Sequence, residues 1–411
     1  MQQALSIPEI LAQIGEFLDS KSLSICTRVS KSWSAAFDTI LYRHISILVF
    51  NRYSPSIRAL KRHARQTFSL TLTLPVDLGY FTLKCPSLRA LHLHGWLGTR
   101  LKTIAGYSTR GHRKALALIQ QHQRTLITVS VGLLWPIAKS PEFWTAIAAC
   151  PRLETLLVRD EKMFVNNGDH SEQEAFWNAC TKVSDLKLKD LRFQAAVNVP
   201  VGLDFSQVRK LELLRTEGWH ADKQVMWMER CSELRVLNWT LLKVKPPVVG
   251  ASGLTTFTAS WPKLRKLTLS GQEIRDHDLA AVISTAEALE KLSVPQTQFG
   301  RMAFAALRTH HFQVLRHLNL QDCESATSAM VQEVMESCPG LEYLRAPLLR
   351  SADVLLGAPW VCLQLKQLQL ETFFLSADGI DEEVQKVALS ARFGALKEVS
   401  LIFSHNLSIA R

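Results

Sequence analysis

The hydrophobic positions of this chain follow a spacing that is neither helical nor strictly alternating. In the stretch from Phe312 to Cys323, leucines stand at positions 315, 318 and 320 and a cysteine at 323, which reads L-x-x-L-x-L-x-x-C. A short strand preceded by a bend accounts for this spacing, because its leucines can then all point into one core. The residues between the leucines are expected on the opposite face of the strand.

The same spacing recurs along most of the sequence. After the first gap, successive starts are 24 to 31 residues apart, which is the length of one strand plus one helix. Units of this size cannot bury their apolar faces alone, so they stack into a leucine-rich-repeat solenoid. The predicted fold class is α/β, with parallel strands on a concave face and helices on a convex face. The first apolar positions of the repeats are Leu88, Leu126, Leu153, Val183, Val208, Leu234, Leu264, Leu289, Leu315, Leu341, Leu365 and Leu396.

Helices are expected between the strands, with aromatic side chains that pack against the sheet. The runs at 143–147, 175–177 and 225–228 contain these aromatics in register with the repeat. Trp239, in the last apolar place of its strand, is expected in the core as well. Three loops are predicted: residues 95–111 before a helix at about 113–122, residues 160–171, and residues 244–253.

Residues 6–45 do not follow the repeat and predict a small all-helical segment. Ser6 is expected to cap a first helix, with Pro8 in its first turn and Glu9 completing a capping box. A second helical region extends from Leu23 to Phe37, and a third short helix follows at 41–42. Because so small a core stands poorly alone, part of its apolar surface is expected to be covered by a partner.

This segment resembles an F-box. The resemblance rests on Pro8-Glu9-Ile10-Leu11, Ile14, Phe17-Leu18-Asp19, Leu23, Val29-Ser30-Lys31-Ser32-Trp33 and Leu41-Tyr42-Arg43. Two positions depart from the family pattern: Ile7 replaces the usual leucine, and Gly15 stands where a large apolar residue is common. Together with the repeats, the whole chain resembles an F-box/leucine-rich-repeat protein, with an F-box at 1–45, a linker or first cap at 46–68 and the solenoid at 69–411.

The resemblance implies a role in ubiquitin transfer. F-box domains dock onto the adaptor subunit of SCF-type cullin ubiquitin ligases, and the repeats would then bind a protein substrate. Trp33 is expected either in the adaptor contact or wholly inside the helical core. The alternative reading of the segment is a helical cap that shields the first repeat. The residues implied to touch the adaptor, or to hold the surface that does, are Pro8, Ile10, Leu11, Ile14, Leu18, Leu23, Val29 and Trp33.

The polar positions of the strands should gather on the concave face, which we expect to bind a protein. Lys187, Lys189 and Lys210 are predicted to lie on neighbouring strands. Such a cluster is either partly compensated by Asp185 and Glu212 or completed by an acidic or phosphorylated segment of the substrate. The candidate substrate-binding residues are Arg159, Lys187, Lys189, Lys210, Asn238, Tyr343 and Arg345.

Charge is unevenly distributed. The chain has a formal net charge of +11, yet residues 50–130 contain thirteen Lys and Arg and a single acid, Asp77. This local excess is typical of a solvated surface, but it also fits a docking patch for an acidic partner. The run at 61–65 could serve as a nuclear address. A nucleic-acid-binding protein that uses the basic region 50–130 is a less favoured alternative.

No set of residues predicts an enzyme or a cofactor. The motifs of phosphate-binding loops, dinucleotide folds, serine hydrolases and zinc proteases are missing from the sequence. The eight cysteines form no C-x-x-C pair, and seven stand at turns next to a repeat, so they predict reduced, structural thiols without metal. His92-x-His94 places two imidazoles on one face but lacks a third ligand at metal-like spacing.

Overall composition sets the remaining expectations. With 411 residues and 47% hydrophobic content the chain can bury a large core, and its apolar runs are too short to span a bilayer. It lacks a secretory leader, so a soluble protein of the cytoplasm or nucleus is expected. The function predicted from sequence is a non-catalytic substrate-recognition subunit of an SCF-type ligase, and the first alternative is a non-degradative interaction scaffold.

Overall fold

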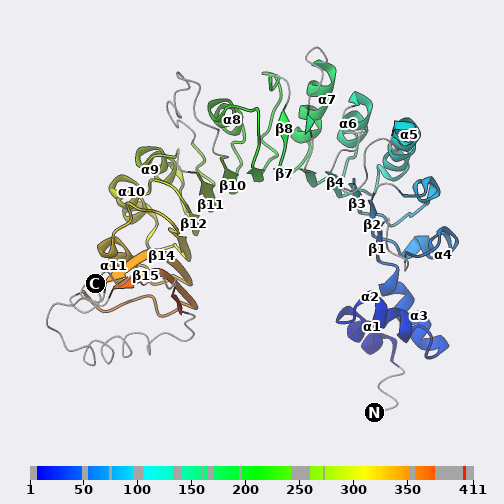
Figure 1. The fold of residues 1–411 in the computed structure, drawn as a ribbon, viewed down its shortest axis with the longest axis horizontal. Helices are drawn as coiled ribbons and strands as arrows, with labels where there is room; N and C mark the ends of the chain where they lie inside the picture. Colours follow the sequence, from blue (N-terminus) through cyan, green and yellow to red (C-terminus); the bar gives the residue numbers. More distant parts are fainter. Residues whose placement is uncertain are drawn as a thin grey trace, which may run out of the picture. The chain divides into compact units, whose positions relative to one another are not determined.

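A computed structural model of the chain describes residues 7–48, 54–73, 76–95, 105–132, 140–159, 162–163, 170–193, 197–241, 260–271, 274–350, 357–374 and 401–403. The chain divides into two compact units, Met1–Leu203 and Asp204–Arg411. Each unit is described by itself, with the elements labelled as in Figure 1.

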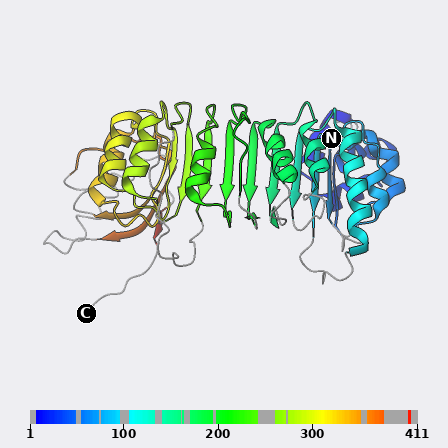
Figure 2. The same ribbon diagram turned by 90° about the horizontal axis from the view of Figure 1, so that it is seen from above.

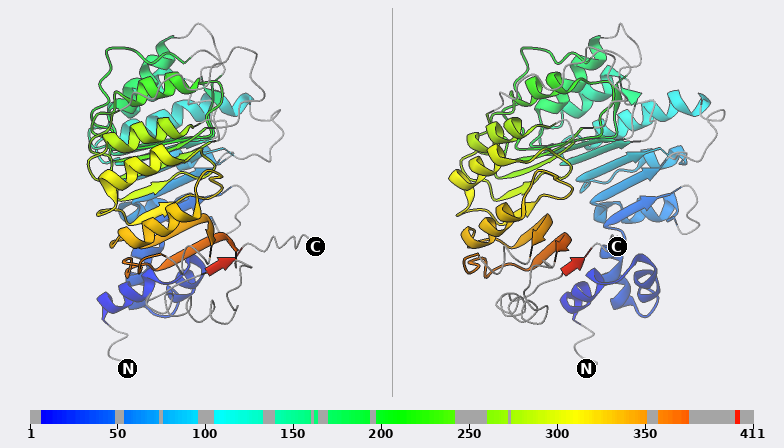
Figure 3. Two further views of the ribbon diagram at one scale, coloured as in Figure 1. Left: turned by 90° about the vertical axis from the view of Figure 1, so that its left-hand side faces the viewer. Right: turned by 60° about the vertical axis from the view of Figure 1, so that its left-hand side comes forward.

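The first unit begins with three helices, α1 (Pro8–Glu16), α2 (Ser20–Cys26) and α3 (Lys31–Leu41). These helices form the dark-blue bundle that is clearest on the right of Figure 3. Their boundaries differ from those expected. Residue 6 lies outside the described residues, and Ile7 is the N-cap of α1 without a side-chain capping bond. The predicted second helix is split at Ser30, which caps α3, and Leu41 ends α3 rather than forming a helix of its own.

Parallel strands follow, in the order β1 (His44–Ile47), β2 (Ser69–Thr73), β3 (Ala90–His94), β4 (Thr128–Gly132), β5 (Thr155–Arg159) and β7 (Asp185–Lys189). The sheet begins earlier than the repeat pattern indicates, because β1 pairs with β2. A separate two-stranded ladder joins β6 (Lys162–Met163) to β8 (Arg192–Phe193).

The helices of the first unit lie on one side of these strands. They are α4 (Ile57–His63), α5 (Ala105–His122), α6 (Pro141–Ala148) and α7 (His170–Thr181), with two short 3-10 helices at Ala64–Gln66 and Leu78–Thr82. Two predicted loops were partly wrong. Residues 107–111 belong to α5, and β6 lies within the segment predicted as a loop at 160–171. The predicted loop at 244–253 and the repeat start at Leu396 fall outside the described residues.

The second unit repeats the same plan. Its strands run parallel in the order β9 (Lys210–Leu214), β10 (Val236–Thr240), β11 (Lys266–Ser270), β12 (Lys291–Ser293), β13 (His317–Asn319), β14 (Tyr343–Arg350), β15 (Gln367–Phe374) and β16 (Leu401–Phe403). Its helices are α8 (Ala221–Met228), α9 (Asp276–Thr285), α10 (Arg301–His311) and α11 (Ser328–Ser337). Figure 2 shows the strands of each unit running side by side with helices against one face.

The register explains the spacing of the leucines. Except for β6 and β8, each strand from β3 to β15 starts two residues after the first apolar position of its repeat, as β13 does after Leu315. The leucines are fully buried and stack in register, for example Leu292 beside Leu318 and Leu318 beside Leu344. This is the α/β repeat architecture that the sequence predicts. The core aromatics are confirmed as well, since Trp144, Trp177, Trp227 and Trp239 are among the largest fully buried side chains.

One carboxylate ties consecutive repeats of the second unit together. Asp276, in the first turn of α9, accepts hydrogen bonds from the backbone N–H groups of Gly300, Met302 and Ala303 at 2.8, 2.9 and 2.9 Å. These donors belong to the N-terminus of α10, where backbone N–H groups lack partners within the helix. The contact also requires a glycine at 300, because a Cβ there would lie 2.8 Å from Asp276 Oδ2.

Two general searches concern the described residues alone. Within these ranges no helix combines the length and apolar character needed to cross a membrane. Within the same ranges, no group of His, Cys, Asp and Glu is arranged to hold a metal ion.

Candidate functional site

The three N-terminal helices enclose a small core that fixes which side chains stay exposed. Leu11, Leu23 and Phe37 are buried, one from each helix. Each of the two later helices is capped at its start: the Asp19 carboxylate accepts from Ser22 N at 2.7 Å, and the Ser30 hydroxyl accepts from Trp33 N at 3.2 Å. Leu18, Cys26, Trp33, Ala36, Ile40 and Leu41 pack around this core as partly buried side chains.

Gly15 of α1 lies against α3. It is buried, and a Cβ at this position would lie 2.4 Å from Ile40 Cδ1 and 3.0 Å from Phe37 Cδ1. The glycine therefore faces the internal helix contact and not a partner. A larger residue here could not add a contact with the adaptor unless α3 moved.

Large apolar side chains are unusually exposed in this part of the molecule. Twelve large hydrophobic residues are exposed in the described chain, and five of them lie between residues 7 and 29. An exposed apolar side chain is common by itself, but a concentration of them in one small domain marks an interaction surface. The five are Ile7, Ile14, Phe17, Ile25 and Val29, with Phe17 90% exposed. We call them, together with exposed Pro8, the helical apolar face.

The residues predicted to contact the adaptor therefore fall into three groups. Pro8, Ile14 and Val29 are exposed. Ile10, Leu18 and Trp33 are partly buried, and Trp33 meets Phe37 edge to face at 5.4 Å between ring centroids. Leu11 and Leu23 are core residues, which can only hold the surface.

Sequence reasoning left Phe17 and Ile25 out of the candidate site. Phe17 belongs to the segment that resembles an F-box and Ile25 to the predicted second helical region, but spacing alone does not indicate that either side chain points outward. The signal that could have found Phe17 is its place at the end of α1, two residues before the Asp19 cap.

The predicted substrate-binding residues all occupy the polar positions of strands, on the face opposite the buried leucines, here called the strand face. Arg159 ends β5, and Lys187 and Lys189 lie on β7, all in the first unit. Lys187 Nζ is 3.4 Å from Asp185 Oδ2, so part of its charge is compensated by its own strand.

The remaining predicted residues belong to the second unit. Lys210 lies on β9, 3.4 Å from Glu212 Oε1, and Asn238 lies on β10. The three lysines of the expected cluster are thus divided between the two units. Lys187 and Lys189 lie on β7 of the first unit, and Lys210 lies on β9 of the second.

Tyr343 and Arg345 share β14, where the side chains are held in place by neighbours. The Tyr343 ring stacks on His317 with 4.1 Å between centroids and 5° between planes, and its hydroxyl donates to Gln369 Oε1 at 3.0 Å. Burial, aided by the charge of Lys291, lowers the pKa of His317 to about 4. The His317 imidazole is therefore uncharged near pH 7, and this part of the strand face presents uncharged polar groups at His317, Tyr343 and Gln369.

The cysteines are free thiols at all eight positions. Seven are buried, and Cys26 is partly buried among the three N-terminal helices. Burial raises the pKa of Cys85, Cys150 and Cys362 to about 11, and burial raises that of Cys231 and Cys338 to about 12. Thiols of such high pKa are poor nucleophiles and poor metal ligands at neutral pH.

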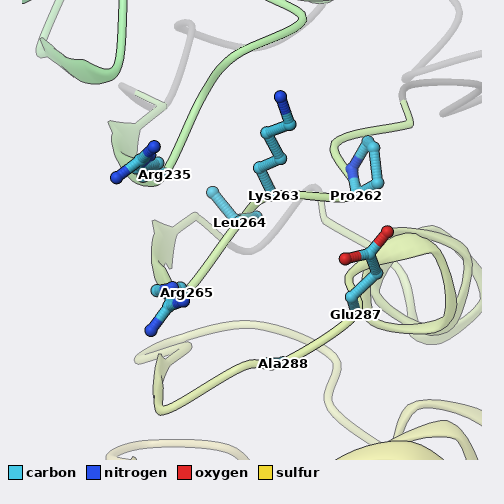
Figure 4. A pocket seen from close by; sticks show the side chains of 7 residues that line it. All are labelled: Arg235, Pro262, Lys263, Leu264, Arg265, Glu287 and Ala288. Carbon is cyan, nitrogen blue, oxygen red and sulfur yellow. The ribbon is translucent and has the colours of Figure 1, made fainter.

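A small pocket of about 190 Å³ lies at the starts of strands in the second unit. Figure 4 shows Arg235 and Arg265 on neighbouring strand starts, with Glu287 opposite. Two of its cations already have partners, because Lys263 contacts Glu233 at 2.7 Å and Arg265 contacts Glu290 at 2.9 Å. A pocket of this size, below the roughly 300 Å³ typical of small-molecule sites, offers no reaction centre.

Comparisons with known proteins find family models for two parts of the chain. An F-box-like family model matches residues 8–48, and a model described as "FBD-associated F-box protein At5g56370, LRR repeats" matches residues 203–304. No curated protein matches the sequence. Among solved structures, a chain in the crystal structure of the Rad7 and Elc1 complex in yeast is 17% identical with a TM-score of 0.49, over 94% of this chain and 98% of that one.

The fold and the family models define a two-part protein, with an F-box-like domain followed by leucine-rich repeats. These two matches are consistent with an F-box/leucine-rich-repeat protein.

Proposed function

We propose that this protein is the substrate-recognition subunit of an SCF-type ubiquitin ligase. The F-box-like domain would bind the adaptor subunit and, through it, the cullin, and the repeats would bind a protein substrate. The observation that carries the proposal is the helical apolar face, in which Phe17 and four other large apolar side chains are exposed on a domain of about forty residues. Burial of such side chains supplies most of the free energy of protein association.

The mechanism is one of proximity and needs no catalytic residue from this chain. Holding a substrate near the ubiquitin-carrying enzyme raises the effective concentration of substrate lysines at the transfer site. What this chain contributes is two binding surfaces, the helical apolar face and the strand face. The adaptor contact fixes the position of the repeats, and the strand face selects the substrate.

The proposal is tested with the full-length chain and a variant that lacks residues 1–42. The cut falls before His44 because β1, His44–Ile47, pairs with β2 and belongs to the sheet. Full-length protein should capture the purified adaptor subunit, and the truncated protein should not, while both show the same circular dichroism signal for the repeats. Adaptor capture that survives the truncation would refute the proposal.

A second measurement separates a ligase subunit from an interaction scaffold. In cells, proteins bound to the strand face should accumulate when residues 1–42 are deleted, because their ubiquitination would stop. Bound partners whose abundance is unchanged by the deletion would favour the scaffold.

A further inference from the structure

A cluster of polar groups on the strand face of the first unit has no part in the fold described so far. It lies on β3, β4 and β5, which pair in parallel. Two adjacent rows of the register form it: the first is His92, Ser130 and Leu157, and the second is His94, Gly132 and Arg159. We call these rows the β3–β5 cluster.

Gly132 makes room for the Arg159 side chain. A Cβ on residue 132 would lie 2.7 Å from Arg159 Cγ and 3.3 Å from Arg159 Nε. The first of these contacts is shorter than those found in proteins, so this position of the Arg159 side chain across β4 requires a residue 132 without a side chain. Burial first, and then the charge of Arg159, lower the pKa of both His92 and His94 on β3.

Two polar atoms of the cluster are buried without a hydrogen-bond partner. Ser130 is 1% exposed, and its hydroxyl has no hydrogen-bond partner among the residues that the structure describes. His94 Nδ1 is also buried and unpaired. A buried polar atom left without a partner costs about 1–3 kcal/mol, so such atoms are rare and call for an explanation. A ligand that supplies oxygen atoms to both would remove this cost.

The charges that face the cluster are mostly positive. The ring centroids of His92 and His94 lie 6.2 Å apart. Burial first, and then the Arg159 charge, lower the pKa of each imidazole, that of His94 to about 4. Both imidazoles are therefore neutral near pH 7. On β7, beside β5, stand Lys187 and Lys189, and Asp185 lies in the next row with its carboxylate 3.4 Å from Lys187. Permanent positive charge from Arg159 therefore adjoins groups that can donate hydrogen bonds.

We propose that the β3–β5 cluster binds the phosphate monoester of a phosphorylated serine or threonine in the protein substrate. The inference rests on the proposed function and names the substrate class of the strand face. A phosphate monoester has three acceptor oxygens and up to two negative charges, which match the Arg159 fork, the Ser130 hydroxyl and an imidazole N–H together. A carboxylate has two oxygens and one charge and would satisfy fewer of these groups.

The geometry favours a single phosphate over a nucleic-acid backbone. Binding to nucleic acid depends on a series of cations that follow successive phosphates, with aromatic rings that stack on bases. In the β3–β5 cluster one guanidinium and two imidazoles converge on one place instead. The unit around it supplies a positive field, since residues 50–130 contain thirteen Lys and Arg against one acid.

The experiment uses the full-length chain and two fluorescent peptide pools. Each pool has degenerate flanking positions, with a fixed phosphoserine in one and serine in the other, and binding is followed by fluorescence anisotropy at physiological ionic strength. Three variants are compared: R159Q removes the guanidinium, G132A displaces it without changing the charge, and K291Q removes a cation from the strand face of the second unit as the matched control. Inorganic phosphate serves as competitor.

The expected result is preferential binding of the phosphoserine pool, with competition by inorganic phosphate. R159Q should weaken this binding about tenfold or more, the loss expected for a charged hydrogen-bonding partner. G132A should weaken it in the same direction, and K291Q should stay within about twofold of the natural sequence. R159Q preserves the backbone, so it decides the outcome if G132A proves unfolded by circular dichroism.

Three results would overturn the inference. One is equal affinity for both pools, and another is an R159Q variant that binds as tightly as K291Q. The third is a random single-stranded oligonucleotide that binds more tightly than the phosphoserine pool and is lost in R159Q, which would assign the cluster to nucleic acid. Adaptor capture is measured on the same preparations. A natural sequence that captures the adaptor but does not prefer the phosphoserine pool refutes this inference and leaves the proposed function standing.

Discussion

Phe17 is the residue whose replacement tests the helical apolar face most directly. Its side chain is 90% exposed at the C-terminal end of α1, so it contributes little to the core formed by Leu11, Leu23 and Phe37. We predict that F17A leaves the domain folded and weakens adaptor binding. By contrast, L11A removes a core side chain and should unfold the domain.

The size of the effect follows from the exposed surface. A phenylalanine side chain is among the largest that an interface can bury. Full burial of such a side chain is worth about 2–3 kcal/mol relative to leaving it exposed. Since nine-tenths of Phe17 remains exposed in the free protein, nearly all of this free energy is available to a partner. Truncation to alanine should therefore raise the dissociation constant by about 30-fold to 150-fold.

The assay is surface plasmon resonance of full-length protein on immobilised adaptor subunit. M226A is the matched control, because Met226 on α8 is 66% exposed and lies in the second unit. The F17A effect should appear mainly in the dissociation rate. An F17A variant that binds within about twofold of M226A, with an unchanged melting temperature, would show that the helical apolar face is not the adaptor contact.

Four further predictions concern stability and chemistry. G15A gains about 1 kcal/mol of helix propensity but loses about 1–3 kcal/mol to overpacking against Ile40. The backbone amides of α1 should therefore exchange hydrogen faster in G15A. Adding I40V, which removes the Cδ1 atom, should restore part of the lost stability. D276A removes three backbone hydrogen bonds and should destabilise α10 by about 2 kcal/mol or more by hydrogen exchange, whereas D276N, which keeps one acceptor oxygen, should lose less. The pKa of His317 is depressed to about 4, so its neutral form is compatible with the fold above about pH 6.5, and stability is lost as pH falls from 6.5 towards 4. H317Q should reduce this loss when the free energy of unfolding is measured against pH. An unaltered pH dependence in H317Q would contradict the depressed pKa. Thiol titration in denaturant without reductant should return all eight cysteines, and six or fewer would contradict the free thiols.

The repeat strands could be predicted because a single physical constraint fixes them. An apolar side chain at the first, fourth and sixth positions of each repeat has to enter a shared core, so the starts of the strands from β3 to β15, apart from β6 and β8, follow from the apolar pattern. The first strand, β1, escaped prediction because His44–Ile47 has only two core residues, Ile45 and Ile47, and Tyr42, not a leucine or valine, stands two residues before its start. It becomes a strand because the edge of β2 supplies its hydrogen-bond partners.

Site residues were harder to predict because a sequence records which residues are polar but not how far their side chains reach. The position of the Arg159 side chain in the β3–β5 cluster depends on Gly132. In the sequence, Gly132 is only a glycine near the end of an apolar stretch. Its effect on Arg159 requires the register of β4 against β5. The sequence presents His92 and His94 only as two histidines without a third metal ligand. The structure adds that both are buried beside the Arg159 guanidinium, which favours an anionic ligand over a metal cation.

Helix α1 shows how one short sequence can serve both folding and recognition. Leu11, Gly15 and Leu18 are spaced by four and three residues, and this stripe faces the core and α3. A second apolar stripe, at positions 7, 10, 14 and 17, has the same helical spacing, but three of its members are exposed and Ile10 is partly buried. Leu11 and Gly15 of the first stripe are buried within the domain, whereas most of the second stripe stays exposed and available to a partner. Substitutions on the two stripes should therefore separate, with losses of folding from the first and losses of adaptor binding from the second.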